Sequence, residues 1–171
     1  SDGGVSLCMA TFSMLLQCLD GMKITDRIIQ SKGGFSIRYR TSIPRCVGLS
    51  GSSAIITACW RSLMSFYGLS LSDIGIPKEY LPSLILEIEK RELNIAAGLQ
   101  DRVIQSYGGL VHMNFSADQS DSGATKDMNT IVSTLTKPGK YTSLSPSLLP
   151  PMYLIYNTNA GGNSGRVHST V

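Results

Sequence analysis

The apolar residues of this chain recur at the three- to four-residue spacing of a helix in four segments. These segments are 5–19, 55–67, 81–93 and 99–107. Gly21, Gly68 and Gly108 follow the first, second and fourth segments, and glycine commonly ends a helix. Pro82 stands in the first turn of the third, where proline is tolerated. The pattern therefore predicts four helices, each with one apolar face.

Three further segments have the composition or the alternation of strands. Apolar and polar residues alternate from Phe35 to Ile43, which predicts a half-buried antiparallel strand. Segments 110–115 and 152–156 are apolar and β-prone, and we expect strands there too. The stretch 116–147 is rich in Ser, Thr, Asp, Gly and Lys, and we expect a loop or a flexible insertion. Helices interspersed with antiparallel or mixed strands indicate an α+β fold in one domain over 1–171.

Composition narrows the class of protein. The net charge is only +3 and no long basic run occurs, so nucleic acid is not expected as a partner. The longest apolar stretches are interrupted by Ser, Gln, Gly or charged residues, so no membrane span is expected. The sequence shows neither an initiator Met nor a signal peptide, which suggests an internal fragment.

The cysteines and histidines point to a reduced core rather than to a metal. The four cysteines have no CxxC spacing and lie within apolar patterns: Cys8, Cys18, Cys46 and Cys59. They predict buried thiols of a cytoplasmic protein. With only His112 and His168 besides, we expect no zinc site. Trp60 falls on an apolar helix face and is expected in the core.

The segment from Pro44 to Ala54 reads Pro-Arg-Cys-Val-Gly-Leu-Ser-Gly-Ser-Ser-Ala and opens the second helix. The first N–H groups of a helix lack partners and lie at the positive end of its dipole, so they form an anion site, most naturally for phosphate. Gly48 and Gly51 would let the backbone approach such a ligand. The serine hydroxyls in this segment can bind phosphate oxygens or Mg²⁺. They are Ser50, Ser52 and Ser53.

Two alternatives bear on this segment. It is not a Walker A loop, because no Lys precedes the final hydroxyl. A plain Gly/Ser turn with Ser52 or Ser53 as the helix N-cap remains open.

Charged residues elsewhere are ambiguous from the sequence alone. Asp101 lies in the first turn of its helix, where the dipole stabilises a carboxylate. The run 87–92, with three glutamates, has the pattern of a solvated helix face. Arg102 can pair with Asp101, with bulk anions or with a substrate carboxylate. Gly108 and Gly109 can be a simple helix stop. Other arginines compete with Arg102 for a substrate carboxylate: Arg38, Arg40, Arg45 and Arg166.

The loop resembles the central motif of the GHMP kinases, roughly Pro-x-x-x-Gly-Leu-Gly/Ser-x-Ser-Ser-Ala. The matching residues are Pro44, Gly48, Leu49, Ser50, Gly51, Ser52, Ser53 and Ala54. Segment 98–109, Gly-Leu-Gln-Asp-Arg-Val-Ile-Gln-Ser-Tyr-Gly-Gly, is similar to the catalytic segment of the sugar kinases in this family. Segments 148–151 and 164–169 narrow the resemblance to the plant-type glucuronokinase branch. It runs from about Gly3 to Val171, interrupted at about 116–147.

The resemblance implies a partial GHMP-kinase N-terminal domain and the reaction of ATP with D-glucuronate to give ADP and D-glucuronate 1-phosphate. ATP phosphates would bind residues 48–54. Mg²⁺ would lie between Glu89 and the hydroxyl of Ser52 or Ser53. Glu89 precedes Asp101 by the twelve residues that separate metal ligand and catalytic Asp in galactokinase-like members. Asp101 would take the proton of the sugar hydroxyl. The sugar would lie beside three residues: Arg102, Gly108 and Gly109.

Other readings stay open. Within the family, the second hypothesis is another sugar kinase, of the arabinokinase, galacturonokinase, fucokinase or heptose kinase type. From other classes, it is a non-catalytic nucleotide-binding relic or an α+β interaction domain whose Gly/Ser loop is only a cap. The family's N-terminal Gly-rich segment and its C-terminal Gly-rich motif are not found in these residues. We therefore expect this polypeptide alone to be poorly stable and inactive, with bare strand edges and apolar patches.

Overall fold

The computed structural model describes residues 3–44, 47–94, 97–116 and 128–157. The α-helices are α1 (Gly3–Gly21), α2 (Thr25–Gln30), α3 (Gly51–Tyr67), α4 (Leu81–Leu93) and α5 (Gln100–Tyr107). The strands are β1 (Leu110–Asn114) and β2 (Lys140–Leu144), and the short 3₁₀ helices are η1 (Lys78–Tyr80), η2 (Thr130–Thr134) and η3 (Pro146–Leu148). The α+β prediction and the four predicted helices are confirmed, whereas α2 has no counterpart among the predicted elements.

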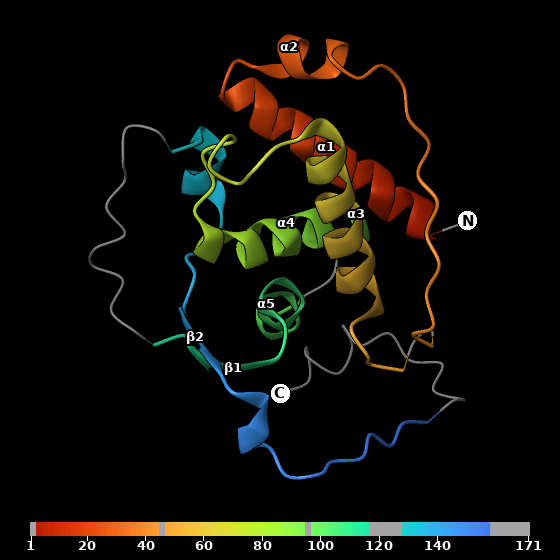
Figure 1. Ribbon diagram of the computed structural model, residues 1–171, viewed down its shortest axis with the longest axis vertical. Coiled ribbons are helices and arrows are strands. Elements are labelled where there is room, and N and C mark those ends of the chain that lie inside the picture. Colours follow the sequence, from red (N-terminus) through yellow and green to blue (C-terminus); the bar gives the residue numbers. More distant parts are fainter. Residues whose placement is uncertain (1–2, 45–46, 95–96, 117–127, 158–171) are drawn as a thin grey trace.

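The main core lies where α1 packs against α3 and α4 (Figure 1). Each of these helices contributes side chains that are almost completely buried: Leu15, Cys18, Leu19, Ile56, Trp60, Leu63, Leu84, Ile85 and Ile88. Their three- to four-residue spacing places them on one face of each helix, which is the reason that periodicity located these helices correctly. Trp60 lies in this core, as predicted.

A second, smaller apolar cluster joins α4 to α5 and to the strands. It consists of Leu86, Leu99 and Val103, with Val111 and Tyr141 of the strands packed against it. In Figure 1, α5 lies next to α4, with the two strands beyond it. This cluster fixes α5 against α4, and α4 also contacts α3, so the three helices bring their polar residues together.

The prediction of an irregular insertion over 116–147 is wrong for much of its described part. Lys140–Leu144 forms β2 and pairs antiparallel with β1, with His112 opposite Thr142. Val132 and Leu135, in and next to η2, are buried in the main core. A strand that is covered on only one side needs few apolar residues, so the polar composition of this stretch did not indicate β2. Residues 117–127 lie outside the described residues.

The predicted strand at 35–43 is also wrong. The segment is extended, but it pairs with no strand among the residues that the structure describes, and its side chains are exposed from Phe35 to Ser42. Phe35 instead packs edge-on against Phe12 of α1, with ring centroids 5.2 Å apart. The predicted strand at 152–156 is likewise exposed chain without strand pairing within the described ranges. Alternation sets which side chains face one way, but a strand also needs a neighbour to pair with.

Within the described residues, α1 is the single helix that is long and apolar enough to cross a membrane by length and composition. Its buried side packs against α3 and α4, and this core packing accounts for the apolar composition. The thiols of Cys8, Cys18 and Cys59 are free and buried, as the cysteine pattern predicted. Cys46 and His168 lie outside the described residues.

Candidate functional site

The Gly/Ser loop leads directly into α3, as the sequence predicts. Gly48 has φ +76° and Ser50 has φ +56°, so the chain turns sharply through left-handed backbone before the helix. Ser50 is the residue before α3, and its side chain makes no capping hydrogen bond. The alternative in which Ser52 or Ser53 is the N-cap is therefore wrong. The N–H groups of the first turn have no intrahelical acceptors, so they are suited to an anion.

The neighbouring serines of this first turn have different partners. Ser53 is completely buried, and its Oγ donates a 3.0 Å hydrogen bond to the carbonyl of Ser50 within the loop. Ser52 Oγ donates a 2.6 Å hydrogen bond to Oε1 of Glu89 on α4. Of the two serines that the sequence left as equal candidates, Ser52 is the one that lies beside Glu89.

Glu89 is 1% exposed and is held by an arginine of the next helix. Arg102 donates from Nε to Glu89 Oε2 at 2.8 Å, and its Nη2 donates to the same oxygen. Its Nη1 donates to the carbonyl of Gly98 at 3.1 Å and lies 3.4 Å from Oδ2 of Asp101. Contacts therefore run from the loop through Glu89 and Arg102 to Asp101.

The carboxylate of Asp101 differs from that of Glu89 in its access to solvent. The Asp101 side chain is 47% exposed, whereas the Glu89 side chain is 1% exposed. Asp101 lies in the first turn of α5, near the positive end of the helix dipole. An exposed carboxylate can reach a small molecule in solution, whereas a buried carboxylate can act only on a group that enters beside it.

The oxygens of Ser52 and Glu89 fit a magnesium ion. Mg²⁺ takes six oxygen ligands at about 2.0–2.1 Å, so neighbouring ligands of one ion lie about 2.9 Å apart. Ser52 Oγ and Glu89 Oε1 are 2.6 Å apart, and Arg102 occupies only the other carboxylate oxygen. The described residues contain no cluster of three His, Cys, Asp or Glu side chains, and Mg²⁺ commonly needs only one or two carboxylates with phosphate and water.

Of the three residues expected beside the sugar, Arg102 contacts the catalytic candidate Asp101, whereas Gly108 and Gly109 lie at the other end of α5. Gly108 and Gly109 follow the C-terminal end of α5, whereas Asp101 is in its first turn. A helix of eight residues is about 12 Å long. The guanidinium of Arg102 is buried against Glu89 rather than open to solvent. The sequence left Asp101, bulk anions and a substrate carboxylate open as partners of Arg102, and nothing in its spacing signalled the pair with Glu89.

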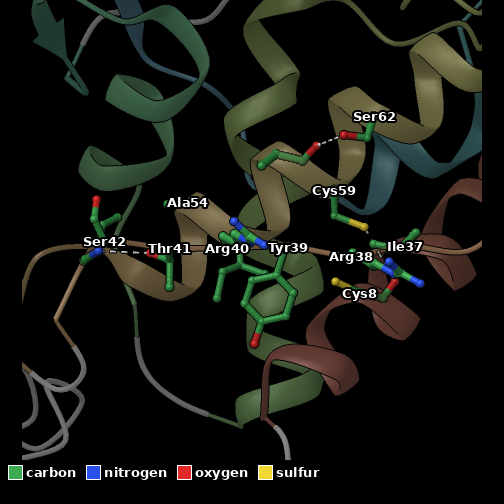
Figure 2. Close-up of a pocket in the computed structure, with 13 residues that line it drawn as sticks. Cys8, Ile37, Arg38, Tyr39, Arg40, Thr41, Ser42, Ala54, Cys59 and Ser62 are labelled. Atoms are coloured by element: carbon green, nitrogen blue, oxygen red, sulfur yellow. Dashed lines mark hydrogen bonds between the residues drawn. The ribbon is translucent and has the colours of Figure 1, made fainter.

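A cavity of about 390 Å³ lies between the extended segment and the helices α1 and α3. Its lining residues are Cys8, Ile37, Arg38, Tyr39, Arg40, Thr41, Ser42, Ile43, Ala54, Ile55, Ala58, Cys59 and Ser62. Figure 2 shows the segment crossing α3, with Ala54 at one end and Cys8 and Cys59 at the other. Burial raises the pKa of the Cys59 thiol to about 12, so this thiol stays protonated at neutral pH.

Arg38 and Arg40 line this cavity and form no ion pair with the residues that the structure describes. Sequence reasoning named both residues but did not find the cavity, because the segment was expected to lie in a sheet. Arg45 and Arg166, the other candidates for a substrate carboxylate, lie outside the described residues.

Known proteins are similar to this chain over the segments that carry these residues. The family described as GHMP kinases N terminal domain matches residues 6–109, which include the loop, Glu89 and Asp101. A probable glucuronokinase 2 of Arabidopsis thaliana is 44% identical over 172 residues, covering 99% of this chain and 40% of the relative. Glucuronokinase 1 of the same plant is 42% identical over 170 residues, covering 99% of this chain and 41% of the relative.

A bacterial relative matches a shorter part. A D-glycero-alpha-D-manno-heptose 7-phosphate kinase of Campylobacter jejuni is 31% identical over 81 residues, covering 47% of this chain and 22% of the relative. The chain spans about two fifths of the length of the plant relatives that it matches. The comparison with solved structures gave no match.

Proposed function

Because the chain belongs to the GHMP kinase family, we propose that the protein is an ATP-dependent sugar-1-kinase that phosphorylates the anomeric hydroxyl of D-glucuronate. The products are ADP and D-glucuronate 1-phosphate. The observation that carries this proposal is the contact of Ser52 with Glu89, at a helix start suited to phosphate and linked through Arg102 to Asp101. The choice of D-glucuronate rests on the names of the two plant relatives.

In this proposal the loop holds the phosphates of ATP. Backbone N–H groups of residues 48–53 donate to phosphate oxygens, and the α3 dipole adds to the attraction, whereas the N–H of Ala54 donates to the carbonyl of Ser50. Gly48 supplies the left-handed backbone that shapes the loop, at φ +76°. Mg²⁺ bound by Ser52 Oγ and Glu89 Oε1 would neutralise charge that develops on the transferred phosphoryl group.

Asp101 is the proposed catalytic residue. Its half-exposed carboxylate accepts the proton of the anomeric hydroxyl and orients that oxygen toward the γ-phosphate. Phosphoryl transfer requires little covalent chemistry from the protein, so positioning of these few groups is most of what the chain must do.

The carboxylate of the sugar needs a cation, because it distinguishes glucuronate from glucose. We propose Arg38 or Arg40 for this role, since both line the cavity beside Ala54 in the first turn of α3. An arginine fork can bind a carboxylate with two parallel hydrogen bonds, which gives selectivity as well as affinity. The buried free thiols suit a reducing compartment, so we place the reaction in the cytoplasm.

The test uses the full-length native protein with ATP and Mg²⁺. ADP release is measured with D-glucuronate, D-galacturonate, L-arabinose, L-fucose and D-glucose, and the product is examined by phosphorus NMR. We expect fast ADP release with D-glucuronate and a phosphate on its anomeric carbon. D-glucose is the matched control, because it differs from D-glucuronate only in carrying a hydroxymethyl group in place of the carboxylate. Faster turnover of another sugar would identify that sugar, and not D-glucuronate, as the substrate. ATP binding without phosphate transfer to any sugar would show a non-catalytic nucleotide-binding protein instead.

A further inference from the structure

Arg102 is a buried cation to which the proposed reaction gives no role. The residue is only 5% exposed, and its guanidinium contacts two carboxylates, those of Glu89 and Asp101. Removing a charge from water is costly unless the charge is well paired. A buried arginine between two acidic residues of one site therefore requires an explanation.

The hydrogen bonds of Arg102 are unevenly divided over Glu89. Both Nε and Nη2 donate to Oε2, and Oε1 is left for Ser52. An arginine fork that faced the carboxylate symmetrically would have used both oxygens. The observed arrangement fixes the rotation of the carboxylate and leaves one oxygen directed at the phosphate loop.

We propose that Arg102 is a positioning residue. It holds the carboxylate of Glu89 with Oε1 toward Ser52, and it sets the position of this carboxylate relative to that of Asp101. The inference rests on the proposed function, in which Glu89 is a ligand of Mg²⁺. Glu89 belongs to α4 and Asp101 to α5, so their relative position depends on groups that bridge the two helices. Arg102 bridges them with side-chain contacts to both carboxylates.

A purely structural tie between helices is the alternative, and Arg61 provides the matched control. Arg61, on α3, donates from Nη2 to the carbonyls of Gln105 and Ser106 at 3.1 and 2.9 Å. It therefore also ties another helix to α5, but through carbonyls near the end of α5 opposite Asp101. If Arg102 acts only as a tie, replacing either arginine should have the same kind of effect.

The experiment compares Arg102→Met, Arg102→Lys and Arg61→Met in the full-length native protein. Mn²⁺ is titrated with a non-hydrolysable ATP analogue present and followed by electron paramagnetic resonance, beside the Kd of the analogue, kcat and Tm. For Arg102→Met we expect Mn²⁺ affinity and kcat to fall about 10- to 100-fold, as for groups that orient metal ligands. The Kd of the analogue should change little. Arg61→Met should lower Tm and leave Mn²⁺ affinity unchanged.

The lysine variant separates the two roles. Lysine restores the charge of the buried pair but not the planar fork that places two N–H groups on one oxygen. We expect Arg102→Lys to recover Tm but not Mn²⁺ affinity. In a Glu89→Gln background, Arg102→Met should weaken Mn²⁺ binding little further, because the carboxylate to be positioned is gone.

Several results would overturn the inference. Parental Mn²⁺ affinity in Arg102→Met, or recovery of Mn²⁺ affinity and kcat in Arg102→Lys, would show that Arg102 only ties α4 to α5. If Arg102→Met does not fold, the lysine variant decides alone: a folded protein with weak Mn²⁺ binding supports the inference, and one with parental binding refutes it. If the parental protein transfers no phosphate to any sugar, the proposed function fails, and the Mn²⁺ titrations still decide the role of Arg102.

Discussion

The side chains of Ser52 and Glu89, 37 residues apart in the sequence, meet in a 2.6 Å hydrogen bond between Oγ and Oε1. A serine in the first turn of a helix more often serves its own backbone, as Ser53 does through its bond to the carbonyl of Ser50. Ser52 instead contacts the neighbouring helix α4. The loop that begins α3 is thereby joined to a buried carboxylate, and two adjacent serines have different hydrogen-bond partners.

Ser52→Ala and Ser53→Ala should therefore have opposite profiles. Removal of the Ser52 hydroxyl takes away a proposed Mg²⁺ ligand, and we expect kcat to fall about tenfold or more with a raised Mg²⁺ requirement. Ser53→Ala removes a neutral hydrogen bond and should cost about 0.5–1.5 kcal/mol of stability with kcat nearly unchanged. Turnover against Mg²⁺ concentration and urea unfolding measure the two effects. A larger loss of kcat in Ser53→Ala would contradict the assignment.

Asp101→Asn tests the proposed proton acceptor. The amide keeps the size of the side chain but cannot take up the proton, so we expect kcat with D-glucuronate to fall about 10²- to 10⁴-fold. The Kd for ATP should change much less, because the loop holds the phosphates. Glu92→Gln is the control, since Glu92 is an exposed carboxylate of α4, and it should keep parental turnover. Unchanged turnover in Asp101→Asn would exclude the role as a base.

Periodicity located the helices because their burial follows a regular spacing, as at Leu15, Trp60 and Ile85. The Gly/Ser loop was also predictable, since Gly48 has the backbone that favours glycine. In contrast, periodicity did not separate Glu89 from the other glutamates of its helix. Its twelve-residue distance from Asp101, a family spacing, did so, and in the structure Glu89 is buried whereas Glu92 is exposed.

Other features depend on contacts between distant segments, which local patterns do not record. The alternation of 35–43 is that of a strand, yet no partner strand pairs with it among the described residues. The buried pair of Arg102 with Glu89 joins two helices, and neither residue's neighbours in the sequence indicate it. Asn129 falls in the stretch 116–147, where the polar composition predicts a loop. Composition alone does not distinguish a buried, hydrogen-bonded asparagine from an exposed one.

Asn129 connects three parts of the main core, and its loss should destabilise the protein. Its Nδ2 donates to the carbonyls of Cys18 and Ile74 at 2.6 and 3.0 Å, and its Oδ1 accepts from the N–H of Ile131. Asn129→Ala takes this donor from the buried carbonyl of Ile74, at about 1–3 kcal/mol for such a group, whereas the carbonyl of Cys18 still accepts from the N–H of Met22. We expect a lower midpoint in urea unfolding at an unchanged m-value.

Asn114→Ala is the matched control for this substitution. The Oδ1 of Asn114 also accepts a backbone N–H, that of Ser116, but at an exposed position. Water replaces such a bond, so this variant should lie within about 0.5 kcal/mol of the parent. An equal loss of unfolding free energy in the two variants would mean that the hydrogen bonds of Asn129 contribute no more to stability than surface hydrogen bonds do.

The buried thiol of Cys18 should make stability depend on alkaline pH. Burial raises its pKa from the ordinary 9.0 to about 12. Below pH 9 the thiol is protonated in both the folded and the unfolded chain, and its contribution to the free energy of unfolding is fully present. Between about pH 9 and 12 the unfolded chain loses this proton while the folded chain keeps it, so stability falls by up to about 1.4 kcal/mol per pH unit.

The measurement is the free energy of unfolding from pH 8 to 11 in the parent and in Cys18→Ala. Burial also raises the pKa of the tyrosines Tyr67, Tyr107 and Tyr141, which add slope of the same sign, so only the difference between variants reports Cys18. We expect Cys18→Ala to be less stable at pH 8 but to lose stability less steeply above pH 9. Met14→Ala removes a buried side chain of the same helix that does not titrate, so it should lower stability equally at each pH. Parallel curves for the parent and Cys18→Ala would show that the thiol does not change its pKa on folding.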